Sequence, residues 1–477
     1  MSINRLVPDI LNPKGKAMRF QLKSTLVVLA LSVSAFALPA FADNPLLESD
    51  FWKEANLATV EAAVAGGADP VELGEGNYTP LVRAIRGGAS LDVIDYLVAQ
   101  GADVNRPSHD GRPAIFWAGR YGDLALVKHV IALGADVAAT EESGRNALGY
   151  AAFGQKNKDV FEFLVAQGLD PNATDDSGRN AALSAARSNS DLGTVEYLAS
   201  ISDISARTTD GADAFMLSAQ RNGNLDVIKA MMALSSDVHA VTSDDGSDAL
   251  LLAAVRNDNV DVFTYLLENG FSADAKTSTK RSALSVAAYR NSEDIVQMFL
   301  QAGNDVNGAD AAGKTPLFYA AERNSADVVS QLLAAGADVN VTDANGNTAL
   351  LVAAGRDRSG TEDIIGLLVA AGADATVVNK DGVNAVLAAA DTGHSLAVVK
   401  GFVEAGADVN AVDKDLMSPL MYVALTGQDP AVVQFLLDAG ANAKLGDDFG
   451  DTAADMVAEN EALAGTEAAA LLTAAVQ

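Results

Sequence analysis

The chain has no cysteine and only four histidines among its 477 residues. Without cysteine, disulfide bonds, zinc–thiolate centres, thiol nucleophiles and a lipidated N-terminal cysteine are all excluded. The four histidines, at positions 109, 129, 239 and 394, are far apart, and no two have the spacing of a metal-ligand pair. We therefore expect no metal site and no cofactor.

Motifs of catalysis are missing as well. The sequence has no glycine loop of the kind that cradles phosphate, no Gly-x-Ser-x-Gly elbow, and no nucleophile beside a recognisable base. Two aspartate-rich turns, at residues 343–346 and 447–450, are superficially similar to calcium loops, but their glycine comes at the fourth position instead of the sixth. We interpret both as ordinary turns, and we expect no enzyme activity.

Basic residues are scarce. Lysine and arginine number 33 against 63 aspartates and glutamates, which gives a net charge of −30. Such a chain should repel nucleic acid and anionic lipid, so we expect neither as a partner. The acidity has two interpretations: it serves solubility or a saline habitat, or it attracts a basic partner.

Long apolar runs are absent except for residues 26–38, which basic residues precede and Ala40-Phe41-Ala42 follows. This is the form of a cleaved secretory signal peptide over residues 1–42, and the run is too short for an easy membrane span. An uncleaved anchor is the alternative. Met18 is an alternative start, because the stretch before it is long and polar for a leader. We expect the mature chain in the periplasm or secreted, without membrane attachment.

A repeated pattern with a period of 33 to 36 residues fills the rest of the chain. Each copy has a turn residue, a helix-capping residue two places later and a small residue five places after that. The turn positions are Asn77, Gly111, Gly144, Gly178, Gly211, Gly246, Lys280, Gly313, Gly346, Gly382, Leu416 and Gly450. Eleven of the twelve capping positions hold Ser, Thr, Asp or Asn, and Pro113 is the exception. Such repetition predicts a stacked solenoid.

Residues 310–340 show what one copy contains. Asp310 and Gly313 predict a tight turn, after which the Thr315 hydroxyl should cap a helix that has Pro316 at its first position. Apolar residues at helical spacing then predict a second helix with a stripe that neighbouring copies cover, and Gly336 should end that helix in the left-handed conformation.

These residues resemble the ankyrin repeat, whose Asp-x-x-Gly-x-Thr-Pro-Leu start and Gly-Ala-Asp-Val-Asn end are matched almost letter for letter. The resemblance covers about residues 45–477. It implies an all-α solenoid of about 13 helix-turn-helix units with short β-turn fingers. We expect an N-terminal capping repeat at 43–74, eleven ankyrin repeats at 75–449 and a C-terminal capping repeat at 450–477. The copies that start near residues 178, 211 and 280 depart from the pattern, so the sequence specifies the stacking of these copies least.

Basic side chains recur at two fixed places in the copies. The row at the end of the first helices consists of Arg86, Arg120, Arg187, Arg221, Arg256, Arg290, Arg323 and Arg356. The row directly after the turn residues consists of Arg112, Arg145, Arg179, Arg281 and Lys314. The resemblance implies that both places line a concave groove in which the family usually holds partners.

Two interpretations of these rows stay open. In the structural one, each arginine meets the negative end of a helix dipole, acidic neighbours neutralise it, and the asparagine after it, as in Asn222, Asn257, Asn291 and Asn324, is a left-handed stop residue. In the functional one, the groove grips an acidic or carboxylate-bearing protein segment through bidentate contacts. Most aromatic residues nearby should pack between repeats, and Tyr78 and Trp117 are candidate interface anchors.

The sequence thus predicts a non-catalytic, monomeric protein-interaction scaffold in the bacterial periplasm, with a protein partner in the concave groove. By resemblance, such exported proteins guard or support envelope enzymes. One alternative is a passive acidic envelope spacer or weak cation-binding protein. The other is a hydrolase whose site is built across repeats.

Overall fold

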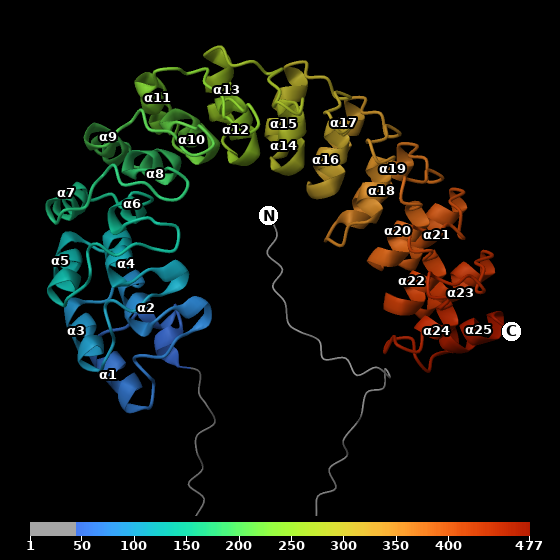
Figure 1. The fold of residues 1–477 in the computed structure, drawn as a ribbon, viewed down its shortest axis with the longest axis horizontal. Coiled ribbons are helices and arrows are strands. Elements are labelled where there is room, and N and C mark those ends of the chain that lie inside the picture. Colours follow the sequence, from blue (N-terminus) through green and yellow to red (C-terminus); the bar gives the residue numbers. More distant parts are fainter. Residues whose placement is uncertain (1–43) are drawn as a thin grey trace, which may run out of the picture. The chain divides into compact units, whose positions relative to one another are not determined.

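Two short helices follow each turn of the repeated pattern, so that twelve helix pairs succeed one another after Thr79 (Figure 1). The computed structural model describes residues 44–477, and the expected signal peptide lies outside the described residues. No helix in the described part is long and apolar enough to cross a lipid bilayer.

The first helices of the pairs are α2 (Pro80–Arg86), α4 (Ala114–Tyr121), α6 (Ala147–Ala151), α8 (Ala181–Ser188), α10 (Ala214–Arg221), α12 (Ala249–Arg256), α14 (Ala283–Arg290), α16 (Pro316–Arg323), α18 (Ala349–Ala354), α20 (Ala385–Thr392), α22 (Pro419–Thr426) and α24 (Ala453–Met456). The second helices are α3 (Leu91–Ala99), α5 (Leu124–Ala132), α7 (Lys158–Ala166), α9 (Leu192–Ile201), α11 (Leu225–Leu234), α13 (Val260–Glu268), α15 (Glu293–Gln301), α17 (Ala326–Ala334), α19 (Thr361–Ala370), α21 (Leu396–Glu404), α23 (Pro430–Asp438) and α25 (Glu467–Ala475).

An incomplete unit precedes the first pair. Two 3-10 turns, Pro45–Leu47 and Phe51–Lys53, stand where a first helix would be, and α1 (Leu57–Ala65) is its second helix. The indole of Trp52 is buried and donates to the carbonyl of Leu46 at 3.0 Å. The first of these turns contacts α2 and α1 contacts α3, so the unit covers the N-terminal face of the stack. The division into capping and internal repeats stays a prediction.

The backbone confirms every predicted turn position. All twelve have a positive φ, from 59° at Leu416 to 87° at Gly211. Glycine adopts this conformation at no steric cost, whereas a side chain crowds the neighbouring carbonyl. Lys280 and Leu416 nevertheless adopt it, with φ of 64° and 59°. The turn is therefore kept even in the copies that depart from the pattern.

Nine of the predicted capping side chains accept a hydrogen bond from the backbone amide three residues on: Thr79, Asn146, Asn180, Asp213, Asp248, Ser282, Thr348, Asn384 and Ser418. The prediction for Thr315 is wrong, because its buried hydroxyl has no hydrogen-bond partner in the described structure. The amide that it would cap, Phe318 N, donates instead to the Thr315 carbonyl at 3.1 Å. Helix α16 thus begins with a tight 3-10-type bond that replaces the side-chain cap.

Packing runs along the stack. First helices pack on the first helices of the next pair, as α14 does on α16, and second helices pack on second helices, as α17 does on α19. The predicted apolar stripe of α17 is fully buried at Val328, Val329 and Leu332. Strand-like pairing in residues 44–477 is limited to four isolated bridges at the base of the turns. The unit of residues 45–477 is therefore an all-α solenoid, as predicted, with the first helices on its inner, concave side (Figure 1).

Asparagines at the ends of the first helices fasten neighbouring pairs together. The side-chain amide of Asn222 donates to the carbonyl of Ala186 at 2.8 Å and to that of Asn189 at 2.9 Å, both in the preceding copy. The same two bonds recur at Asn189, Asn222, Asn257, Asn291, Asn324 and Asn460, which we call the asparagine row.

The prediction that these asparagines are left-handed stop residues is wrong. The backbone of Asn222 is extended, with φ −77° and ψ 125°, and Asn257, Asn291 and Asn324 are extended as well. In this conformation the side chain turns back toward the helix ends of the preceding copy, where carbonyl groups lack partners within their own helix. The asparagines therefore serve stacking rather than local helix termination.

Candidate functional site

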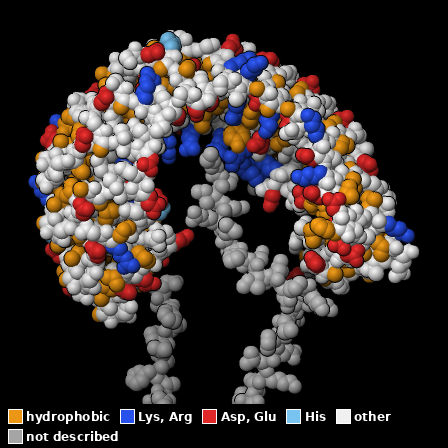
Figure 2. Space-filling model, viewed as in Figure 1, with side chains coloured by type: hydrophobic (Ala, Val, Ile, Leu, Met, Phe, Trp, Pro, Cys, Tyr) orange, Lys and Arg blue, Asp and Glu red, His pale blue; other side chains and the backbone are white. Residues whose placement is uncertain are grey.

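Five arginines without an acidic partner line the concave side over the middle of the stack. They are Arg187, Arg221, Arg256, Arg290 and Arg323, in the last turns of α8, α10, α12, α14 and α16, and we call them the central arginine row. Arg187 is half-buried and the other four are exposed. Within residues 44–477 none of the five makes a salt bridge, and Figure 2 shows basic side chains gathered on this inner edge.

The electrostatics of Arg187 show that these charges act on one another. Burial lowers the pKa of Arg187 to about 10, and the positive charges of Arg179, Arg221 and Arg256 act in the same direction. Neighbouring positive charges disfavour the protonated form of Arg187, and an anion that binds nearby would favour it. Arg187 is still protonated at pH 7.

The row after the turns is different, because its N-terminal members are neutralised. Arg145 contacts Glu141 at 2.8 Å and Asp175 at 2.7 Å, and Arg179 contacts Asp175 at 3.0 Å. Arg112 pairs with Glu141. The carboxylates of Glu141 and Asp175 are fully buried by these contacts. For these three arginines the structural interpretation holds, and they offer little charge to a partner.

The pKa of Asp175 reflects this pairing. Burial by itself would raise it, but hydrogen bonds from Arg145 and Arg179 outweigh burial and hold the pKa below its usual range. Farther along the same row, Lys314 lies 3.5 Å from Glu322. Arg281 has no salt bridge in the described residues, and its guanidinium lies 3.9 Å from the centre of the Tyr319 ring.

Aromatic rings hold the two N-terminal arginines of the first row. Arg86 lies 4.9 Å from the ring centre of Tyr78 and 5.1 Å from that of Trp117, and Arg120 lies 5.0 Å from that of Tyr150. Trp117 is only 2 % exposed and its Nε1 donates to a serine hydroxyl, so it packs in the core. It is therefore not available as an interface anchor, whereas Tyr78 is half-buried.

Arg356, the last member of the first row, belongs to the scaffold. It is 9 % exposed and donates to the carbonyls of Ala321 at 2.9 Å and Asn324 at 3.2 Å, the two bonds that an asparagine makes in other copies. The reason is that α18 is shorter than its neighbours and ends at Ala354, which brings position 356 to the stacking site. Arg356 is therefore a stacking residue and not a candidate binding residue.

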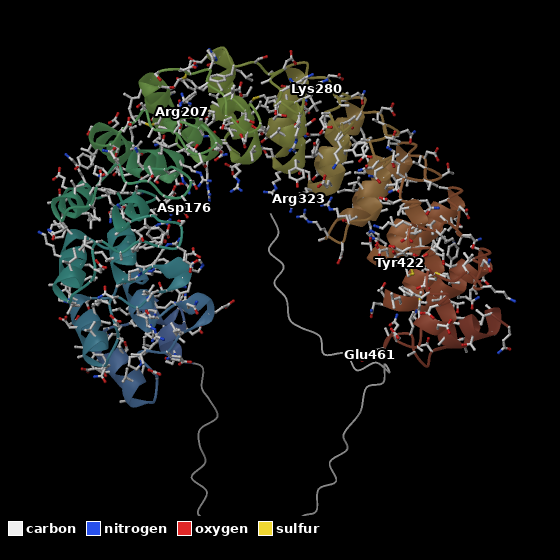
Figure 3. The ribbon with its side chains drawn as sticks, in the orientation of Figure 1. Asp176, Arg207, Lys280, Arg323, Tyr422 and Glu461 are labelled. Carbon is white, nitrogen blue, oxygen red and sulfur yellow. The ribbon has the colours of Figure 1, made fainter. Side chains whose placement is uncertain are left out.

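Beyond Arg323 the concave side changes sign. Asp391 stands where earlier copies have the arginine, and burial together with the nearby Asp413 raises its pKa. The hydroxyl of Tyr422 donates to Asp413 at 2.7 Å. Figure 3 labels Tyr422 and Glu461 in these C-terminal repeats and Arg323 on the inner edge of the central ones. The basic surface is thus confined to the middle of the stack.

The arrangement suits the binding of an extended anion. Arginines at one height in successive copies present planar N–H donors at regular intervals, which matches carboxylates spaced along a peptide. Within the described part of the chain, no three histidine, aspartate or glutamate side chains come together as metal ligands.

The sequence located the central arginine row but not its contrast with the row after the turns. Within the row after the turns, a partial signal was present four places before the arginine, where Arg145 and Arg179 have an acid and Arg281 has Thr277. This signal does not identify Arg112, whose acid Glu141 comes from the next copy. The stacking role of the asparagines had a signal too, because they recur at the same place in half of the copies.

Two family models match the chain. The model described as "Ankyrin repeats (3 copies)" matches residues 115–210, 215–310, 284–379 and 352–448, and the model described as "Ankyrin repeat" matches residues 76–109. Together these ranges cover most of the chain. No curated protein matches it.

Proposed function

Because the chain belongs to the ankyrin repeat family, whose repeats serve as protein-interaction scaffolds, we propose that it is a non-catalytic scaffold that binds an acidic segment of a partner protein. The segment lies along the central arginine row. One observation carries this proposal: five arginines in register on a strongly acidic chain have no acidic partner in the described residues.

The energy of such binding comes from several weak contacts. An exposed guanidinium–carboxylate pair contributes about 0.2–1 kcal/mol, so the row has to act through several contacts at once rather than through a single arginine. The contacts are screened by salt, since most of the row is exposed. Binding should therefore weaken steeply between 50 and 200 mM salt.

We also propose that the scaffold works in the periplasm or outside the cell as a monomer, and that residues 1–42 are removed on export. The leader-like pattern of these residues supports this part of the proposal. N-terminal sequencing of the protein recovered from a periplasmic fraction tests it. A first residue after Ala42 supports export with cleavage, and an intact leader contradicts it.

A labelled 20-residue glutamate-rich peptide tests the binding surface by fluorescence anisotropy. Arg221→Gln with Arg256→Gln removes two exposed members of the row and should raise Kd about 5- to 30-fold, from about 0.5–1 kcal/mol for each contact. The matched control is Lys158→Gln with Lys229→Gln, which changes the net charge equally on the second helices α7 and α11. Equal weakening by the two variants would mean that only net charge matters, and the proposed surface would be wrong.

A further inference from the structure

Three guanidinium groups lie around one tyrosine beside the central arginine row. The guanidinium carbons of Arg281, Arg290 and Arg323 lie 5.1, 5.4 and 5.3 Å from the centre of the Tyr289 ring. Arg323 also donates to the Tyr289 hydroxyl at 3.1 Å. The distance between any two of these guanidinium carbons is therefore no larger than the sum of their distances to the ring centre. The three come from the turn before α14, the end of α14 and the end of α16.

The tyrosine cluster, as we call Tyr289, Tyr319, Arg281, Arg290 and Arg323, lacks the acids that neutralise the equivalent place elsewhere. In the N-terminal copies the arginine after the turn binds an acid four residues before it or at the same position of the next copy, as Arg145 does with Glu141 and Asp175. The residue four places before Arg281 is Thr277, which is neutral. This substitution leaves the arginine without an acid from its own turn.

The next copy does provide an acid, Asp310, but other groups occupy it. Its carboxylate accepts the Tyr319 hydroxyl at 2.5 Å and the backbone amides of Ala312 and Lys314 at 2.8 and 2.9 Å. The other nearby acid, Glu322, lies 3.5 Å from the Lys314 ammonium. No salt bridge to any of the three arginines of the cluster exists within residues 44–477. The cluster is thus a local excess of positive charge on an otherwise acidic chain.

We propose that the tyrosine cluster binds a phosphate monoester carried by the partner's segment. A carboxylate brings one negative charge and two oxygens, whereas a phosphate monoester brings about −1.5 to −2 at pH 7 and three acceptor oxygens. Each of the three guanidiniums lies near the Tyr289 ring and carries several N–H donors. Arg281 gives one of them to the Ser285 carbonyl and Arg323 gives one to the Tyr289 hydroxyl, so further donors remain for phosphate oxygens. Three cations around one ring therefore match the doubly charged group better than the singly charged one.

This inference rests on the proposed function and deepens it, because it names the group that the centre of the surface selects. The phosphate is assigned to a protein segment rather than to a membrane for two reasons. The cluster is continuous with the central arginine row, and the chain's net charge of −30 repels an anionic bilayer.

Two labelled peptides that differ at one position test the inference. Both contain the same glycine, serine and glutamate residues, and the central residue is phosphoserine in one and glutamate in the other. The wild-type chain should bind the phosphopeptide at least ten-fold more tightly at pH 7.5. The preference should shrink at pH 5, because the second phosphate pKa is about 6, while the glutamate peptide stays ionised.

Thr277→Asp is the decisive variant, since it supplies the missing acid. Other copies hold a buried aspartate at this position, as at Asp175 and Asp343, so the fold tolerates it. It should pair with Arg281 as Asp175 pairs with Arg179 and lower phosphopeptide affinity at least five-fold. The control Asn379→Asp adds the same charge at the same position of a copy that has no arginine after its turn, and the preference should persist.

Three results would overturn the inference: equal affinity for the two peptides, equal effects of Thr277→Asp and Asn379→Asp, or sedimentation with phosphatidic-acid vesicles that Thr277→Asp abolishes. The last result would assign the phosphate to a lipid. If the glutamate peptide still responds to the Arg221 and Arg256 substitutions, only this inference fails and the proposed function stands. If neither peptide binds, the proposed function fails as well.

Discussion

The asparagine row makes a stability prediction that can be worked from individual atoms. Asn257 is 3 % exposed, and its amide donates to the carbonyls of Ala219 at 2.8 Å and Asn222 at 3.0 Å. Its side-chain oxygen accepts from the Asn259 amide at 3.0 Å. Replacement by alanine removes all three bonds and leaves two buried carbonyl oxygens without a donor where α10 meets α12.

The expected cost follows from those three bonds. A typical hydrogen bond contributes about 0.5–1.5 kcal/mol net, and the loss is larger where a buried group stays unsatisfied. Asn257→Ala should therefore lower the free energy of unfolding by about 2–5 kcal/mol. Since copies of a solenoid contact only their neighbours, the loss should be concentrated at the junction between the α10 and α12 copies.

Amide hydrogen exchange read by mass spectrometry measures this effect copy by copy. Asn269→Ala is the control, because Asn269 is exposed and donates one bond to the carbonyl of Tyr265. It should cost less than about 1 kcal/mol. The reasoning is refuted if Asn257→Ala costs no more than Asn269→Ala, or if exchange speeds up equally in every copy instead of around α10 and α12.

Three further predictions concern turns, charge pairs and one buried arginine. Lys280→Gly should raise the free energy of unfolding by about 0.5–1 kcal/mol in urea titrations, because glycine removes the steric strain of the positive φ and this gain exceeds its larger loss of chain entropy. A loss of stability would contradict this prediction. Asp175→Asn should destabilise the chain at pH 7, and thermal melts should show a progressively smaller effect below about pH 4. The reason is that the pKa of Asp175 is lower in the folded chain than its unfolded value of about 3.9, so its carboxylate stabilises the fold above that pH and this contribution is lost in acid. An effect independent of pH would contradict it. Arg356→Ala should cost about 2 kcal/mol in the same melts and Arg256→Ala less than about 0.5, and equal costs would deny the stacking role of Arg356.

The fold was predictable because each copy is specified locally. A residue at positive φ and a capping side chain act within a few positions along the chain, so their spacing alone gave all twelve turns and nearly all helix starts. Lys280 shows how strong this signal is, since the period located the turn where the residue type did not. Thr315 shows its limit: the residue type favours a cap, but a backbone carbonyl took the hydrogen bond.

Contacts between copies were much less predictable. Asn222 follows a helix end, where a local interpretation makes it a stop residue, but its partners Ala186 and Asn189 are 36 and 33 residues away. Arg356 has the same position in its copy as Arg323. Because α18 ends early, Arg356 becomes a stacking residue, whereas Arg323 stays exposed. Helix length and partner position are properties of the stack, and the repeat pattern does not encode them residue by residue.

The unpaired state of the central arginine row is the step that connects this structure to a function. In a chain with 63 acidic and 33 basic residues, acidic neighbours are abundant, and Glu141 and Asp175 show that the repeat can place them against arginine without disturbing a turn. One aspartate at position 277 would do the same for Arg281. At Arg281, therefore, the scaffold does not require the positive charge to be free, and at Arg187 burial together with the neighbouring positive charges lowers the pKa. Because the fold could neutralise this charge and does not, we propose that an anionic partner neutralises it on binding.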